Sequence, residues 1–287
     1  MLISKRDMLY KTKGPQKRPF KILNLVTLLL ARGFTKHHVT KLMIIAELKK
    51  CVMRFNKVRE YLSFQRIDRY RIAASTNKGK AITLYKANLR IAQSFHPLLG
   101  VLEVILRNCI NSVLTSHFSD TDWIINQKAG FMADPSLTYL DRSTGKHVIN
   151  DFLKASVEKS ERKFKRHKVR VTSSKIIADQ SFGFWTDLFE AHHYRLLLGR
   201  PIQVFGHLPS GYGRSNVCDK LHTIRQFRNR INHNEPVCFN GAVIDFTYAE
   251  EVYDAIMEIL TWIDPELIKW TKDLDTVRKN IVIAKTI

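Results

Sequence analysis

The sequence predicts an all-α protein, and three stretches carry this prediction. Apolar residues recur at steps of three and four from Val217 to Ile231, as on a helix with one buried face. A second ladder of this kind fills residues 98–117, and a third runs from Thr247 to Ile263. Together they predict a helical scaffold around a shared apolar core.

The composition limits the class of protein. A chain of 287 residues is long enough for one large or two small domains. It carries 47 Lys and Arg against 26 Asp and Glu, a formal net charge of +21, which points to nucleic acid or another anionic surface as partner. The cysteines form no C-x-x-C pair, which predicts reduced thiols in a cytoplasmic protein and neither a disulfide framework nor a zinc site. They are Cys51, Cys109, Cys218 and Cys238.

Residues 1–52 differ from the rest in charge and pattern. Lys or Arg stands at twelve of these positions, against only Asp7 and Glu47. The apolar run from Ile22 to Ala31 is too short to span a bilayer, and no small-residue cleavage site follows it. We therefore expect neither export nor a membrane association. The stretch is interpreted as a basic N-terminal extension, either an accessory arm or a translation start placed too far upstream, before a domain at residues 53–287.

The first half of that domain is expected to contain two main helices. One covers residues 78–95, and the pair His96-Pro97 ends it. The next, over residues 98–117, is the clearest in the chain. Its expected core face comprises Leu98, Leu102, Ile105, Leu106, Cys109 and Val113.

The second half is expected to begin with a loop over residues 119–145, followed by a helix over residues 146–165. Thr247 and Glu250 have capping-box spacing, so a helix is predicted to start there, and Pro265 is expected to end or interrupt it. The expected aromatic core anchors are Trp123, Phe182, Phe184 and Trp185.

Arg228 interrupts the apolar ladder that ends at Ile231. It lies three residues earlier and flanks the buried stripe, so its guanidinium must be paired or face a cavity. Pro236 disfavours helical geometry at Glu235, which predicts that the helix ends near His233, where the negative end of its dipole favours an imidazolium. An inward-facing arginine and a titratable histidine at the helix end indicate an anion-handling site.

Arg228, Asn229 and His233 resemble the RNase motif of HEPN domains. In that motif an arginine and a histidine are separated by four to six residues, and a polar residue follows the arginine. Three stretches, in family order, are similar to the Abi-like (abortive infection, AbiD/AbiF-type) branch: residues 97–108, 181–189 and 224–236. The resemblance runs from about Met53 to about Trp270. It implies a HEPN-type helical bundle with additional helices.

The resemblance also implies a metal-independent endoribonuclease, a toxin of a bacterial antiphage or toxin–antitoxin system that pairs two motifs across a homodimer. An antitoxin, such as a small RNA, would restrain it. Arg228 suits the phosphate, His233 suits the proton steps, and Asn229 suits a hydrogen bond to either group. Glu103 and Arg107 either form an exposed ion pair worth about 0.3–0.5 kcal/mol or, as the resemblance implies, orient the active-site groups. No acidic cluster resembles a two-metal site, so neither metal nor cofactor is expected.

A run of positive charge follows the predicted helix at residues 146–165. Such a run is usually a solvated face, but in a basic chain with a nuclease-like motif we expect it to contact RNA phosphates. The residues are Lys159, Arg162, Lys163, Lys165, Arg166, Lys168 and Arg170. The alternative function is a non-catalytic, RNA-binding helical protein in which Arg228 and His233 only hold phosphate.

Overall fold

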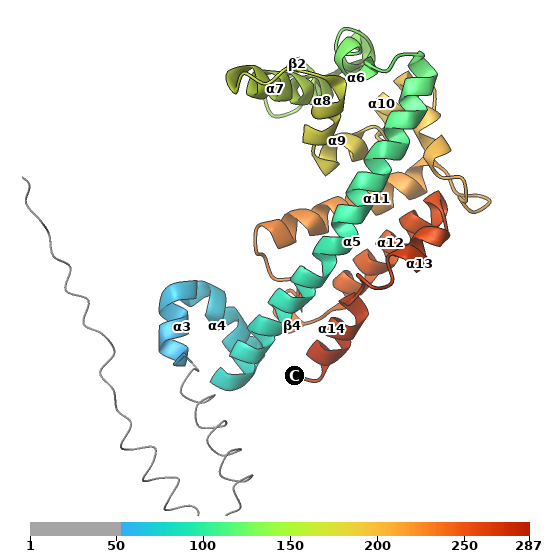
Figure 1. Ribbon diagram of the computed structural model, residues 1–287. Coiled ribbons are helices and arrows are strands. Elements are labelled where there is room, and N and C mark those ends of the chain that lie inside the picture. The colour runs from blue at the N-terminus through green and yellow to red at the C-terminus, as the bar shows by residue number, and fades with distance from the viewer. Residues whose placement is uncertain (1–52) are drawn as a thin grey trace, which may run out of the picture. The chain divides into compact units, whose positions relative to one another are not determined.

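The computed structural model describes residues 53–287 (Figure 1). The chain divides into two units between residues 61 and 62, and residues 62–287 form one compact unit. Helix α3 (Phe55–Leu62) lies at their boundary. The expected basic extension at residues 1–52 lies outside the described residues.

The second unit is mostly helical, which confirms the all-α class. Its helices are α4 (Phe64–Ala73), α5 (Lys78–Phe118), α6 (Trp123–Asn126), α7 (Phe152–Arg166), α8 (Ser173–Asp179), α9 (Phe182–Asp187), α10 (Ala191–Leu196), α11 (Arg214–Asn232), α12 (Thr247–Ile263), α13 (Glu266–Trp270) and α14 (Val277–Lys285), with 3-10 segments η1 (Phe131–Ala133), η2 (Pro135–Leu137) and η3 (Arg200–Val204). The strands are β1 (Thr138–Asp141), β2 (Lys146–Ile149), β3 (Phe239–Asn240) and β4 (Val243–Ile244). They form two antiparallel hairpins, β1–β2 and β3–β4.

Helix α5 is the axis of this unit (Figure 1). It has 41 residues, and its buried apolar stripe runs from Ala81 to Leu114. Helices α4, α9, α12 and α14 and the segment η3 pack against it. By length and hydropathy alone α5 could cross a membrane, but a core helix of a soluble protein meets the same two criteria.

Pro97 does not end a helix, so the prediction of two separate helices at residues 78–95 and 98–117 is wrong. A proline inside a helix removes one backbone hydrogen bond and costs about 3 kcal/mol. Phe95 and Leu98 flank it, and both are fully buried. Burying a side chain of this size stabilises by about 1.5–3 kcal/mol, so the stripe on both sides outweighs the local penalty.

The buried face of α5 also differs from the predicted one beyond Leu106. Ile110 and Leu114 continue the buried stripe in steps of four residues. Each such step turns the stripe by about 40° around the helix, because 3.6 residues complete a turn. The buried face therefore winds around α5 and leaves three predicted core residues half-buried, namely Ile105, Cys109 and Val113.

The segment before α7 is a hairpin, so the predicted loop at residues 119–145 and the helix start at residue 146 are both corrected. Tyr139 pairs with Val148 across β1 and β2, and Gly145 takes a positive φ of 66° in the turn. Aromatic and β-branched residues favour such cross-strand pairs over a helix. Trp123 is fully buried, which confirms it as the anchor of this region.

The start of α12 does not have the predicted capping box, because its N-cap is Phe246. Thr247 is the first helical residue, and its backbone N–H donates to Asp245 Oδ1 at 2.8 Å. Asp245 thus supplies the side-chain acceptor that the prediction assigned to Thr247. The helix ends at Ile263, before Pro265, as predicted.

Replacing Pro97 by alanine should raise the free energy of unfolding by about 1–3 kcal/mol, because alanine restores a backbone donor for the carbonyl of Gln93. Urea unfolding of the full chain measures this. Gly100→Ala in the next turn is the matched control, since open space surrounds its added methyl group and only helix propensity changes, by about 0.5–1 kcal/mol. A Pro97→Ala protein less stable than wild type would show that Pro97 itself supports the packing of α5.

Candidate functional site

Helix α11 presents the candidate site, and its buried face is the predicted one. The buried residues are Val217, Leu221, Ile224, Phe227 and Ile231. The Phe227 ring packs on Phe95 of α5, with ring centroids 4.5 Å apart. This contact sets the rotation of α11 against α5 and places the next residue, Arg228, at the edge of the interface.

The helix ends where the sequence predicts. Asn232 is the last helical residue of α11 and His233 is its C-cap. Asn234 takes a left-handed φ of 54°, and the Glu235 N–H donates to the Arg230 carbonyl at 2.8 Å, which closes the helix end. The His233 side chain is exposed at this end of the helix.

Arg228 is paired, as its position beside the buried stripe requires. Its Nη2 donates to Glu103 Oε2 of α5 at 2.9 Å. The two side chains retain 29% and 20% exposure, so the pair is largely desolvated but reaches solvent. A charge-assisted bond of this kind is stronger than a neutral one and holds the guanidinium in a fixed orientation.

Arg107 does not pair with Glu103, although it lies one turn further along α5. Its Nε donates to the neighbouring Asn108 Oδ1 at 3.4 Å, a long contact. The exposed Glu103–Arg107 ion pair that the spacing allows is thus replaced by the pair with Arg228. Arg107 remains half-buried on the same helix.

Asn229 and His233 both face solvent. Within residues 53–287, no hydrogen bond or ion pair joins the His233 side chain to Arg228 or Glu103. Five residues along a helix rotate a side chain by about 140°, which accounts for the different directions of Arg228 and His233. The structure therefore brings Arg228 and Glu103 together and keeps the histidine apart from them.

Three residues that sequence reasoning missed tie down the segment after α11. Arg66 of α4 donates to the Asn234 carbonyl at 2.8 Å, and Arg230 donates to the Pro236 carbonyl at 3.0 Å. Asn88 of α5, only 2% exposed, accepts from the Val237 N–H at 2.8 Å. The signal for Asn88 was an amide in the apolar register of its helix, because a buried polar group needs a partner.

The seven basic residues expected to contact RNA are all exposed. Four of them, Lys159, Arg162, Lys163 and Arg166, line an open groove of about 810 Å³ along α7. The other three lie at the end of α7 and just beyond it: Lys165, Lys168 and Arg170. The structure therefore gathers part of the predicted RNA-binding set along one groove.

Asp179 is the acidic residue of this groove. Burial would raise the pKa of its carboxyl group, but hydrogen bonds from Lys163 and Ser160 outweigh that effect and hold the pKa below its usual range. Asp179 is therefore negatively charged at neutral pH and offsets part of the positive charge of the groove.

The described cysteines are all free thiols. Burial raises the pKa of Cys109, that of Cys218 to about 11 and that of Cys238 to about 12. Cys218 and Cys238 therefore stay protonated at neutral pH, the form that is a poor nucleophile. Cys51 lies outside the described residues.

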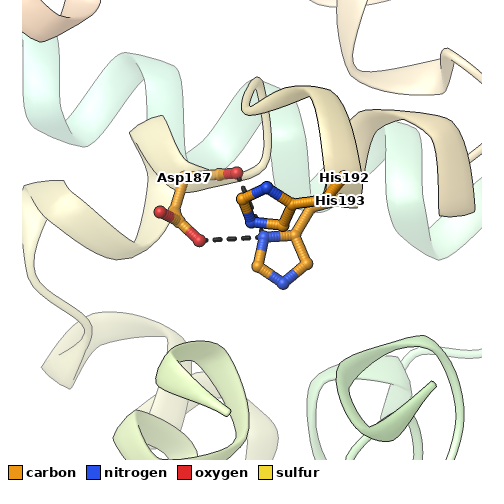
Figure 2. Close-up of side chains that lie close together, drawn as sticks. All are labelled: Asp187, His192 and His193. Carbon is orange, nitrogen blue, oxygen red and sulfur yellow. Dashed lines mark hydrogen bonds and ion pairs between the residues drawn. The ribbon is translucent and has the colours of Figure 1, made fainter. Parts of the chain in front are cut away.

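A second polar cluster, which sequence reasoning also missed, lies where α9 meets α10 (Figure 2). Asp187 ends α9, and His192 and His193 follow in α10. Their side chains converge, with one ligand atom of each within 4.8 Å of the others. The available signal was an aspartate five residues before a His-His pair, but the break between two short helices hides that proximity.

Comparison with known proteins found no match. No protein-family model, no curated protein and no solved structure matches the chain.

Asn88→Ala should lower the free energy of unfolding by about 1–3 kcal/mol, because it leaves the buried Val237 N–H without a partner. Urea unfolding of the full chain measures the change. Asn232→Ala is the control, since Asn232 is exposed at the end of α11 and such a surface change stays within about 0.5 kcal/mol. Equal stability of the two variants would mean that the Asn88–Val237 bond does not hold the segment after α11.

Proposed function

We propose that this protein is a metal-independent RNA endonuclease with a HEPN-type helical bundle. It would act as a toxin in a bacterial antiphage (abortive infection) or toxin–antitoxin system. The observation that carries the proposal is the Arg228–Glu103 pair, a charged arginine held half-buried between α11 and α5, five residues before a histidine at the helix end.

Arg228 is the phosphate-binding group in this proposal. Its planar guanidinium matches the geometry of phosphate oxygens, and Glu103 fixes its direction in advance of binding. Because one nitrogen is engaged by Glu103 and the side chain keeps 29% exposure, the accessible edge can receive a phosphate. Arg107 adds positive charge one turn away on α5, and Asn229 supplies a hydrogen bond from the exposed side of α11.

His233 is the proton-transfer group. One imidazole removes the proton of a ribose 2′-hydroxyl, and the resulting oxygen attacks the adjacent phosphorus. The bond from phosphorus to the 5′-oxygen breaks, and an imidazolium donates a proton to that leaving oxygen. The products are a 2′,3′-cyclic phosphate and a 5′-hydroxyl end.

This chemistry uses both a base and an acid, but one chain contributes a single His233. A homodimer that brings two copies of the Arg228–His233 segment into one cleft supplies both. The different directions of Arg228 and His233 on α11 favour such sharing, because each group then faces a different part of the cleft. Neither a metal ion nor a cofactor has a role in these steps.

RNA is the partner, both as substrate and, as a small RNA, as antitoxin. The basic groove of α7 would hold its backbone through Lys159, Arg162, Lys163 and Arg166. The proposal places the protein in the cytoplasm, where its RNA substrate is, and assigns it no membrane.

A second function is favoured by the exposure of His233 and by its lack of contact with Arg228. In that case the protein is a non-catalytic, RNA-binding helical protein, and the groove of α7 is its main site. The two functions differ in the effect of His233→Ala. If the protein is a nuclease, the His233→Ala variant loses RNA cleavage and keeps RNA binding. If it is only a binding protein, the wild type already shows no cleavage.

Expression of the full chain in bacteria should arrest growth, and either Arg228→Ala or His233→Ala should relieve the arrest. Loss of a proton-transfer group lowers a rate by about 10²–10⁴-fold, so RNA cleavage by the purified His233→Ala protein should fall by that factor. Growth curves and a cleavage assay with labelled RNA measure both effects.

The matched control is His222→Ala, an exposed histidine on the same helix that contacts Gln226. It should remain as toxic and as active as wild type. If Arg228→Ala and His233→Ala proteins are folded, as circular dichroism can show, and still arrest growth like wild type, the assigned site is wrong.

Cleavage should continue in EDTA and leave 5′-hydroxyl ends, because imidazole groups carry the proton steps. Purified full-length protein is incubated with RNA in chelator, below its unfolding midpoint in that buffer, and the fragment ends are identified. Raising the salt concentration should weaken RNA binding, since a basic surface binds RNA largely by counterion release. A 5′-phosphate product, or activity lost in EDTA and restored by Mg²⁺, would contradict this mechanism.

A further inference from the structure

The cluster of Asp187, His192 and His193 has the geometry of a cation site (Figure 2). His193 is fully buried, and its Nδ1 lies 2.8 Å from Asp187 Oδ2 and 3.3 Å from the Asp187 carbonyl oxygen. The His192 ring lies beside the His193 ring, with centroids 4.2 Å apart. Two imidazoles and one carboxylate therefore converge at the turn between α9 and α10.

The contact with Asn150 indicates which ring nitrogen of His192 carries no proton. Asn150 Oδ1 accepts from the Phe152 N–H at 3.3 Å, so its Nδ2 faces His192 and lies 2.9 Å from Nε2. An amide nitrogen only donates, so Nε2 of His192 must be the unprotonated nitrogen. That is the form of histidine which binds metal ions, and a cation at this nitrogen would take the place of the Asn150 N–H.

Within the described part of the chain, the Asp187–His193 contact leaves the buried Asp187 Oδ2 without a hydrogen bond. Asp187 Oδ2 is a buried atom, and within residues 53–287 no hydrogen bond with proper geometry reaches it, despite its 2.8 Å separation from His193 Nδ1. A buried polar atom without a hydrogen bond costs about 1–3 kcal/mol. A cation between the carboxylate and the two imidazoles would satisfy Oδ2 and release the Nδ1 proton of His193 to solvent.

We propose that Asp187, His192 and His193 bind one divalent transition-metal ion, with Zn²⁺ as the best fit. Imidazole and carboxylate ligands are typical of zinc sites, whereas Mg²⁺ and Ca²⁺ prefer oxygen ligands alone. Three protein ligands leave the fourth tetrahedral position for a water molecule or another small ligand.

The ion would link segments of the chain that are separate in sequence. It joins the end of α9 to α10, and through Asn150 it adjoins the segment between β2 and α7. Phe131 also contacts His193, with the two rings edge to face and their centroids 6.4 Å apart. The site is separate from the proposed nuclease site, because it uses neither Arg228 nor His233, so either proposal can fail alone.

The test is zinc binding by tag-free, full-length protein stripped with EDTA and exchanged into chelator-free buffer. Zn²⁺ is titrated in competition with a chromophoric chelator, and the thermal midpoint is followed with Zn²⁺ and, separately, with Mg²⁺. The wild type should bind one equivalent of Zn²⁺ at this site, and its midpoint should rise with Zn²⁺ but not with Mg²⁺, because a ligand that binds only the folded state stabilises it.

The deciding variant is His192→Ala, since it removes one ligand and leaves the Asp187–His193 pair intact. Zinc affinity at this site should fall at least tenfold. His222→Ala, which removes an exposed histidine of α11, should bind like wild type and so accounts for adventitious surface binding. Equal zinc binding by wild type and His192→Ala would overturn the proposal. If His192→Ala does not fold, a wild-type midpoint that is unchanged by Zn²⁺ would overturn it instead.

Discussion

The burial of one continuous apolar stripe along α5 is the constraint on which the rest of the second unit depends. Helices α4, α9, α12 and α14 all pack against this helix, and α11 joins them through the Phe95–Phe227 contact. Helix α5 continues through Pro97, because the free energy gained by burying several side chains of this stripe exceeds the cost of one missing hydrogen bond. The position of Arg228 therefore depends on the orientation of α11 relative to α5.

The orientation of α11 on α5 explains why Arg228 is paired with Glu103. With Phe227 fixed against Phe95, the next side chain must leave the apolar interface at its edge, and a guanidinium there needs a counter-charge. Glu103 supplies it from the facing helix. The same pairing that makes the arginine tolerable also fixes its direction, which is the property a phosphate-binding group requires. Structural need and proposed function are served by one contact.

Two other polar contacts follow a similar logic at places where the apolar pattern is broken. Asn88 occupies a core position of α5 because the Val237 N–H needs a partner after the chain leaves α11. Asp187 and His193 are brought together at a junction of two short helices, where the chain changes direction between buried side chains such as Leu188. The first contact is complete by itself. The second leaves a buried carboxylate oxygen without a hydrogen bond, which is why it implies a ligand and the first does not.

The sequence by itself determined what depends on local periodicity. The all-α class, the buried face of α11 and the end of that helix near His233 all follow from spacings within about twenty residues, because helix period and chain termination are local properties. Local signals failed where tertiary packing overrides them, as at Pro97, or where two strands pair, as in β1–β2. The sequence singled out Glu103 but not its partner, because both Arg107 and Arg228 are possible partners. The packing of α11 on α5 decides in favour of Arg228. The Asp187–His192–His193 cluster and the Asn88–Val237 bond belong to the same class, because each depends on which segments the fold brings together in space.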